Sequence, residues 1–158
     1  MGVIVAIIGV TSIKPYDRGY DFTETAQFID PVRRESELAE EARPKSDIQI
    51  ALSHVGFIYE IRMRGVSAVI GGDSHIRLNR PHVVTDGANR IPVVQAGGEL
   101  DNHLGRLDLT YVYIGGGWLL LDFSGFLYSL AGVEPCQEIQ AILDKYDAML
   151  RAGTQNAA

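Results

Sequence analysis

Three short hydrophobic runs in this chain end in the same way, each followed directly by small and polar residues. The runs are Asp47–Ser53, Ser67–Ile70 and Ile91–Ala96, and a helix-like segment separates the first two. Their length and their β-branched residues are typical of buried strands. Strands that alternate with helices build a sheet with helices on its faces. In such sheets the residues just beyond the carboxyl ends of the strands meet at one edge, where ligands bind.

The amino-terminal part adds a predicted strand and a predicted helix. We interpret Val3–Val10 as a strand, because it lacks the basic start of a signal peptide and is too short to span a membrane. Asp30 and Pro31 are typical of an N-cap and a first helical residue, and Pro44 is expected to stop the helix. Few apolar residues follow Pro31, so we expect a surface helix.

The carboxyl-terminal part changes character. Residues 76–90 are rich in Arg, Asn, Pro and Gly and are predicted as a loop. Leu104–Ile114 and Trp118–Phe123 are strand-like and flank three consecutive glycines, which predicts an antiparallel hairpin. A final helix is expected over 135–150, with an apolar stripe. The sequence thus predicts an α/β (α+β layered) fold with a mixed sheet, a hairpin and a C-terminal helix.

Composition excludes several function classes. The formal net charge is −6, so the chain is a poor candidate for binding nucleic acid or an anionic membrane surface. Cys136 is the single cysteine, which excludes an internal disulfide and a cysteine-cluster zinc site. The length of 158 residues fits one domain.

The polar residues after the strands include ligands that metals accept. His54 follows the first run, and Asp73 and His75 follow the Gly71-Gly72 pair after the second. Neighbouring parallel strands lie about 4.8 Å apart, so side chains from two strand ends can converge on one ion. Histidine and aspartate suit zinc or manganese. A histidine at a strand end is more often a surface or capping residue, and Asp-Ser after two glycines is also good turn chemistry.

A resemblance to a known family adds to this interpretation. It rests on DIQIALSHVG (47–56), GVSAVIGGDSH (65–75) and IPVVQAGGELDNHLGRLDL (91–109). In order and spacing these segments resemble the second half of a 5′-nucleotidase-type metallophosphoesterase domain, which belongs to the calcineurin-like phosphoesterase superfamily. The resemblance implies a partial four-layer αββα sandwich over residues 1–150, with 151–158 as a frayed tail.

The same resemblance implies metal-dependent chemistry. The family hydrolyses phosphate esters with two divalent ions, zinc or manganese by preference, and this chain alone is expected to bind one or none. By position His54 resembles a ligand of one ion and His75 a ligand of the other. Asp73 stands where the family has a histidine, so it is either a variant ligand or a sign of a damaged second site. No catalytic residue and no substrate-binding residue is assigned.

The family motifs of the first half have no counterpart in this chain. They supply the other metal ligands and the histidine that assists the leaving group. The triplet Asp101-Asn102-His103 looks similar to an Asn-His motif, but it follows the GGDSH segment, and we assign it a turn role. We therefore expect a phosphoesterase of nucleotide catabolism that is weak or inactive as this chain alone, so its status as an enzyme stays open. The alternatives are a non-catalytic binding or regulatory module, or a truncated gene product that retains the sheet.

The resemblance also bears on partners and location. A nucleotide or other phosphate ester is the expected substrate of the complete enzyme, and an N-terminal half on a separate chain is a possible partner. Without that half an apolar sheet face would be uncovered, which favours a homo-oligomer or aggregation. We expect no nucleic acid or membrane partner. Relatives are often periplasmic or cell-surface proteins, but no signal peptide is evident here, so the compartment stays open.

Overall fold

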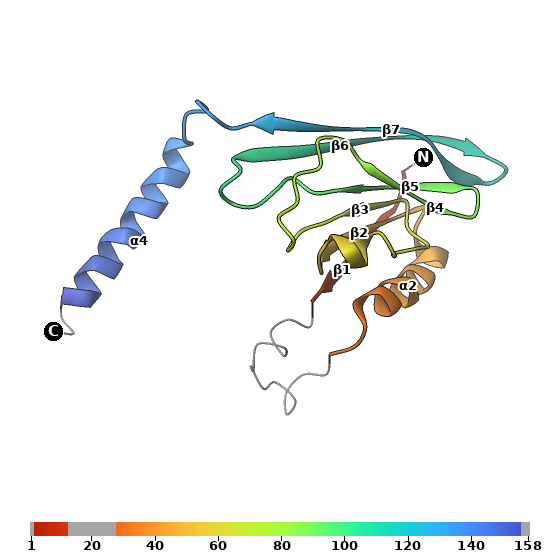
Figure 1. The fold of residues 1–158 in the computed structure, drawn as a ribbon, viewed down its shortest axis with the longest axis horizontal. Helices are drawn as coiled ribbons and strands as arrows, with labels where there is room; N and C mark the ends of the chain where they lie inside the picture. The colour runs from red at the N-terminus through yellow and green to blue at the C-terminus, as the bar shows by residue number, and fades with distance from the viewer. Residues whose placement is uncertain (1, 13–27, 156–158) are drawn as a thin grey trace.

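A five-stranded sheet and a two-stranded hairpin form the frame of the molecule (Figure 1). The computed structural model describes residues 2–12 and 28–155. In the sheet the strand order is β1-β2-β3-β5-β4. The first four of these in space run parallel, and β4 is antiparallel to β5. The strands are β1 (Val5–Thr11), β2 (Ile48–His54), β3 (Ala68–Ile70), β4 (His82–Asp86) and β5 (Asn89–Val94).

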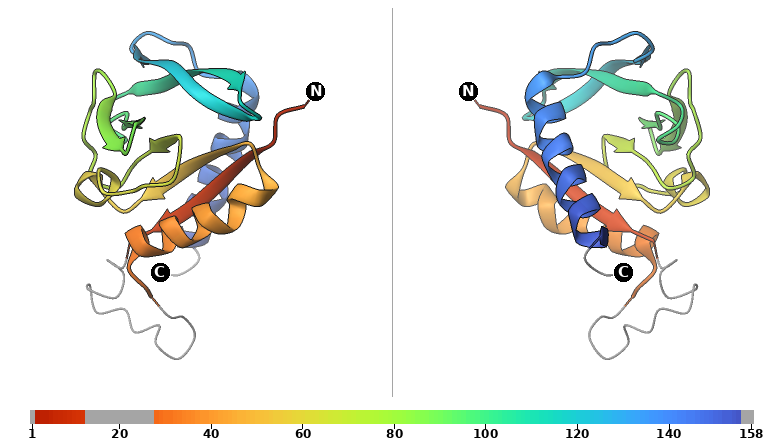
Figure 2. Two further views of the ribbon diagram at one scale, coloured as in Figure 1. Left: turned by 90° about the vertical axis from the view of Figure 1, so that its right-hand side faces the viewer. Right: turned by 90° about the vertical axis from the view of Figure 1, so that its left-hand side faces the viewer.

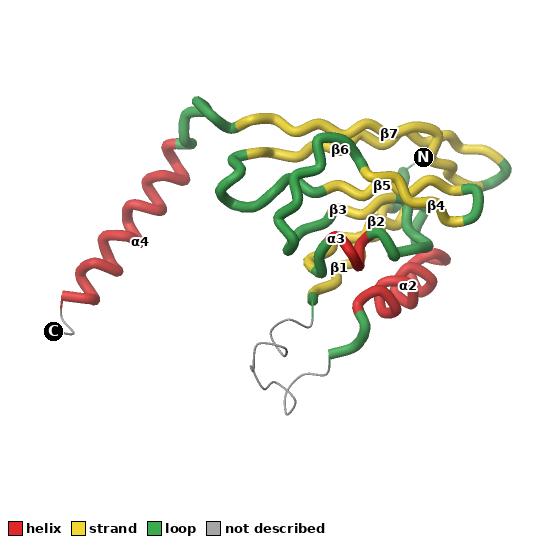
Figure 3. The backbone as a smooth tube through the Cα atoms, viewed as in Figure 1, coloured by secondary structure: helices red, strands yellow, loops and turns green. Residues whose placement is uncertain are grey.

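Helices cover one face of this sheet, and the hairpin covers part of the other (Figure 2). Helix α2 (Pro31–Ala42) is followed by a 3-10 turn (Arg43–Lys45), and α3 (Phe57–Glu60) is a single short turn. The hairpin consists of β6 (His103–Ile114) and β7 (Gly117–Ser129). In Figure 3 the strands are yellow, with α2 and α3 below most of them and the carboxyl-terminal helix α4 to their left. The predicted fold class, with its mixed sheet, hairpin and C-terminal helix, is confirmed.

Alternation along the strands divides the core into two clusters. On the helix face the main cluster includes Ile8, Ala51, Val69 and Val93, with Ala39 of α2 packed among them. On the opposite face Ile48, Ile50 and Ala68 pack against hairpin residues that include Leu107 and Trp118. Burying a side chain of this kind contributes about 1.5–3 kcal/mol, so both clusters hold the sheet in place.

The hairpin leaves the other part of that face uncovered. Leu52 and Ile70 share the face with Ile50 and Ala68, yet Leu52 is 52% exposed and Ile70 is 42% exposed. On the edge strand β1, Val5 and Ile7 are exposed as well. The uncovered part therefore includes the carboxyl ends of β2 and β3, next to the polar strand-end residues.

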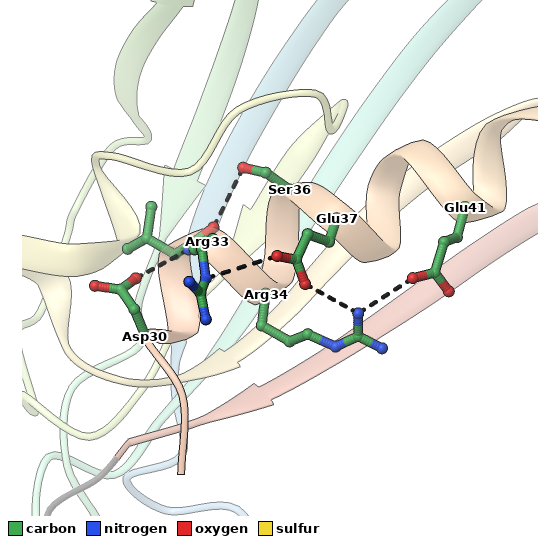
Figure 4. Close-up of polar contacts among 7 residues, drawn as sticks. Asp30, Arg33, Arg34, Ser36, Glu37 and Glu41 are labelled. Atoms are coloured by element: carbon green, nitrogen blue, oxygen red, sulfur yellow. Dashed lines mark hydrogen bonds and ion pairs between the residues drawn. The ribbon is translucent and has the colours of Figure 1, made fainter.

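Helix α2 begins as the sequence predicts, but its buried face differs from the prediction. The Asp30 side chain accepts a hydrogen bond from the Arg33 backbone N–H at 2.9 Å, which caps the helix (Figure 4). Arg34 lies 3.1 Å from both Glu37 and Glu41 on the solvent side. Ala39, on the thin apolar face expected of a surface helix, is fully buried, and so is Glu35, which the sequence pattern placed among the polar residues. A charged residue on this face carries no local sign of burial, because burial depends on the strands and loops that pack against it.

Residues 76–90, which we predicted as a loop, contain an edge strand of the sheet. The segment contains β4, which pairs with β5 around a tight turn where Gly87 has φ 59°. The two turn residues are Gly87 and Ala88, and glycine at the first of two turn positions is typical of a hairpin, although the Arg, Asn and Pro residues nearby favoured a loop. The hairpin strand β7 also extends beyond the predicted end at Phe123, to Ser129.

The last helix, α4 (Gln137–Gln155), stands apart from both sheets (Figure 1). The helix extends to Gln155, into the segment 151–158 that the sequence predicts as a frayed tail. The predicted apolar stripe is present but exposed, and it includes Ile139, Ile142, Leu143, Tyr146 and Leu150. Among the described residues, no helix is long and apolar enough to cross a membrane.

Candidate functional site

The candidate site lies where β2, β3 and β5 end side by side. Leu52 of β2 pairs with Ile70 of β3, and Ile70 pairs with Val94 of β5. The polar residues that follow these pairs therefore emerge at the same edge of the sheet, as the sequence predicts. A hollow at this edge is lined by Thr11, Leu52, His54, Ile70 and Gly72, beside the part of the sheet face that the hairpin leaves uncovered.

The structure brings His54 and Asp73 together. His54 is the last residue of β2, and its Nε2 lies 3.6 Å from Oδ1 of Asp73. The His54 side chain is 65% exposed, whereas that of Asp73 is 12% exposed. Asp73 has a positive φ of 71°, a strained backbone conformation for a residue other than glycine. The Asp73 carboxylate thus faces His54 from a loop whose backbone conformation is unusual for aspartate.

Two glycines make this approach possible. A methyl group at Gly72 would lie 3.3 Å from Nδ1 of His54, and one at Gly56 would lie 3.3 Å from Oδ2 of Asp73. Gly56 also has φ 93°, which L side chains rarely adopt. Larger residues would therefore push the two side chains away from their present positions.

His75 is held in a different pair. Its Nδ1 lies 3.6 Å from Oε2 of Glu99, and both side chains are largely exposed. A methyl group at Gly98 would lie 2.7 Å from the His75 ring, so this loop lies close against it. No group of three or more His, Cys, Asp or Glu side chains within residues 2–12 and 28–155 is arranged to hold a metal. His54, Asp73 and His75 thus do not form one cluster.

A buried carboxylate behind the site was not predicted. Glu60 of α3 is 0% exposed and accepts hydrogen bonds from Ser53 Oγ at 3.1 Å and from the Gly72 N–H at 3.0 Å. Its other oxygen accepts a short hydrogen bond from Nε2 of Gln95. Burial raises the pKa of Glu60, and the hydrogen bond from Gln95 is the largest opposing influence. In the sequence, the sign of this buried carboxylate was that Glu60 is the one acidic residue within the mostly apolar segment 57–61.

Gln95 connects this carboxylate to the loop that carries Asp73 and His75. It is 3% exposed, and its Nε2 also donates to the Gly72 carbonyl at 3.2 Å. Its Oε1 accepts from Ser74 Oγ at 2.9 Å and from the Ile76 N–H at 3.2 Å. The backbone N–H of Ile76 can only donate, so these contacts fix the orientation of the Gln95 amide.

The triplet Asp101-Asn102-His103 forms a turn that leads into β6. Asp101 accepts a hydrogen bond from the Gly98 N–H at 2.7 Å, and Asn102 has φ 49°, which agrees with the turn role assigned to this triplet. His103 is the first residue of β6. Cys136 is exposed, just before α4.

The residues present fit part of a metal site. His54 and Asp73 are close enough to bind the same ion through one nitrogen and one oxygen, a donor set that suits zinc or manganese. Such an ion needs further ligands, and His75 faces Glu99 instead. The described residues would therefore supply two ligands at one position, fewer than a two-metal centre needs.

Comparison with known proteins gives a fold likeness. No family model matches the chain, and no curated protein matches it. Among solved structures, the chain is similar to the calcineurin-like phosphoesterase YfkN from Bacillus subtilis, with a TM-score of 0.68 and 18% identity. The match covers 94% of this chain and 52% of that chain, so this chain spans about half of YfkN. At this identity the likeness concerns the fold.

Proposed function

We propose that this chain provides the carboxyl-terminal half of a metal-dependent phosphoesterase site of the 5′-nucleotidase type. The observation that carries the proposal is the pairing of His54 with Asp73 at the carboxyl end of β2, within a fold that resembles half of a calcineurin-like phosphoesterase. A phosphate monoester of a nucleotide is the substrate class, and this chain alone is weakly active or inactive.

The proposal assigns roles to this chain's own side chains. His54 and Asp73 hold one divalent ion, and His75 contributes to a second position together with groups from outside the described residues. When bound, the ions supply Lewis acidity and an activated water. The hollow beside His54 is also lined by Leu52 and Ile70, which make one side of it apolar.

The low expected activity follows from ligand number. Catalytic zinc sites have three protein ligands and one open position, and a two-metal site needs a ligand set for each ion. The His54–Asp73 pair provides two. A second polypeptide that carries the missing ligands would complete the site and cover the exposed sheet face.

Metal titration tests the proposal. We expect calorimetry with Mn²⁺ to show one weak site on the purified chain, which His54→Ala and Asp73→Ala remove. Asp144→Ala is the control, because Asp144 is an exposed carboxylate on α4, which stands apart from both sheets. The proposal is wrong if the chain binds no Mn²⁺, or if His54→Ala binds it as the wild type does.

Hydrolysis of AMP tests the phosphoesterase activity separately from the binding of metal. We expect little or no phosphate release by the chain with Mn²⁺ present. A rate that His54→Ala abolishes would support the phosphoesterase site and refute the expected inactivity. Metal binding without hydrolysis, even after a complementing half is added, would instead favour the non-catalytic binding module.

A further inference from the structure

We propose that Glu60 and Gln95 are positioning residues that hold the loop 71–76 against the ends of β2 and β5 and thereby place Asp73 opposite His54. The proposal rests on the proposed function, since it takes His54 and Asp73 as the metal-binding pair. Neither Glu60 nor Gln95 touches the ion position itself, so both act through the loop.

The hydrogen bonds of Glu60 join the ends of two strands. Ser53, directly before His54, donates to Oε1 of Glu60, and the N–H of Gly72, directly before Asp73, donates to the same oxygen. One carboxylate oxygen therefore fixes the residue before each member of the His54–Asp73 pair. Since the Glu60 side chain is fully buried, each lost hydrogen bond would leave a buried polar group without a partner.

Gln95 continues this connection from β5 across the loop. It donates to the Gly72 carbonyl on one side of Asp73 and accepts from Ser74 and Ile76 on the other side. Asp73 thus lies between two points that the same side chain holds. This bracing explains how Asp73 keeps its positive φ of 71°, which a loose loop would relax.

The donors and acceptors follow a fixed order along this network. Glu60 can only accept when it is ionised, so Gln95 must turn its NH₂ group toward Glu60 and its oxygen toward Ile76. A rotated Gln95 amide would place NH₂ against the Ile76 N–H, which is a donor facing a donor. The carboxylate of Glu60 therefore determines the orientation of the Gln95 amide, and with it the hydrogen bonds that Gln95 makes to the loop.

Exchange of the two side chains tests this order. Gln95→Glu sets a carboxylate against Glu60 and the Gly72 carbonyl, and Glu60→Gln sets an amide against the amide of Gln95. The double variant Glu60→Gln/Gln95→Glu places a donor at position 60 toward an acceptor at position 95 and keeps an acceptor toward Ser74 and Ile76. It also sets a carboxylate oxygen against the Gly72 carbonyl, so the expected rescue is partial. A merely structural role, in which any buried polar change is harmful, predicts no such rescue.

Amide hydrogen exchange and Mn²⁺ binding, both measured on the full chain, show how these variants change the loop 71–76. We expect each single variant to speed amide hydrogen exchange at Gly72 and Ile76 and to weaken Mn²⁺ binding about tenfold to hundredfold, the range found for residues that orient metal ligands. The double variant should recover part of both. Gln49→Glu is the matched control, because Gln49 is 8% exposed and bonds to Ser46 at the opposite end of β2.

The outcomes separate this proposal from the proposed function. If the wild type binds no Mn²⁺, both fail. If it binds Mn²⁺ and the single variants bind it equally well, or the double variant is as weak as the singles, only the positioning role is refuted. Should a buried single variant fail to fold, Ser74→Ala gives a milder test, since Ser74 is exposed and its hydroxyl bonds to Gln95. It should weaken Mn²⁺ binding in the same direction, and unchanged binding would refute the role.

Discussion

Glu35 is expected to make the stability of this chain fall as pH rises. The residue lies on α2 and is fully buried, and its Oε1 has no hydrogen-bond partner among the described residues. Burial raises the pKa of Glu35 from 4.5 to about 7, while a hydrogen bond from the Arg64 backbone N–H opposes the shift. The folded chain therefore holds this proton at pH values where the unfolded chain releases it.

The direction and size of the change in the free energy of unfolding with pH follow from the folded and unfolded pKa values of Glu35. Below the unfolded pKa both states carry the proton, and burial of the neutral acid costs no ionisation energy. As pH rises toward the folded pKa, the free energy of unfolding falls by up to about 1.4 kcal/mol per pH unit. Above it the loss is constant, at about 3 kcal/mol for this shift. Between pH 5 and pH 8 the wild type should lose about 2.5 kcal/mol through this residue.

Glu35→Gln removes the ionisable group and keeps the shape of the side chain. We expect the variant to gain stability relative to the wild type by about 2.5 kcal/mol between pH 5 and pH 8. Urea unfolding, followed by the fluorescence of the single tryptophan, Trp118, measures both proteins at each pH. The difference between the two proteins cancels every other titrating group that the substitution leaves unchanged.

Glu40→Gln is the control, because Glu40 lies on the same helix and is exposed. Its effect should be small and nearly independent of pH. If Glu35→Gln gives a curve parallel to that of the wild type, the reasoning is refuted. Such a result would mean that the Glu35 carboxyl reaches water in the folded chain.

Two further expectations follow from close contacts and exposed surface. Gly71→Ala should lower the free energy of unfolding by about 1–3 kcal/mol, because a methyl group there would overlap the buried carboxyl of Glu60. Gly117→Ala, where a methyl group meets nothing within 4 Å, is its control, and equal urea midpoints for both variants would contradict the placement of Glu60. Leu52→Lys places a charge on the uncovered sheet face, and we expect it to lower the average mass in sedimentation equilibrium at high concentration. A wild type that is monomeric at every concentration would show that this face does not drive association.

The sequence predicted the elements whose signals are local. The strands β2 and β3 end in glycine, histidine and aspartate directly after a β-branched run, so the edge that gathers His54 and Asp73 could be located from spacing alone. The distance between His54 and Asp73 could not be predicted, because it depends on the positive φ of Asp73. Backbone strain of this kind is set by the surrounding loops.

The residues that sequence reasoning missed owe their roles to partners far along the chain. Glu60 and Gln95 are 35 positions apart, and each would be expected at a surface when taken alone. The strand β4 was missed for a different reason. Its turn signal at Gly87 is local, but nearby Pro, Arg and Asn residues favoured a loop.

Two buried carboxyl groups show that burial by itself does not identify a site. Burial raises the pKa of both Glu35 and Glu60. Glu60 accepts hydrogen bonds from three residues at the ends of β2, β3 and β5, whereas one oxygen of Glu35 has no hydrogen-bond partner among the described residues. The same change from Glu to Gln should therefore act differently at the two positions. At 35 it changes stability with pH and leaves the exchange of the Gly72 amide unaltered, and at 60 it exposes that amide and weakens metal binding. What distinguishes a carboxylate that serves a site is where its hydrogen bonds lead.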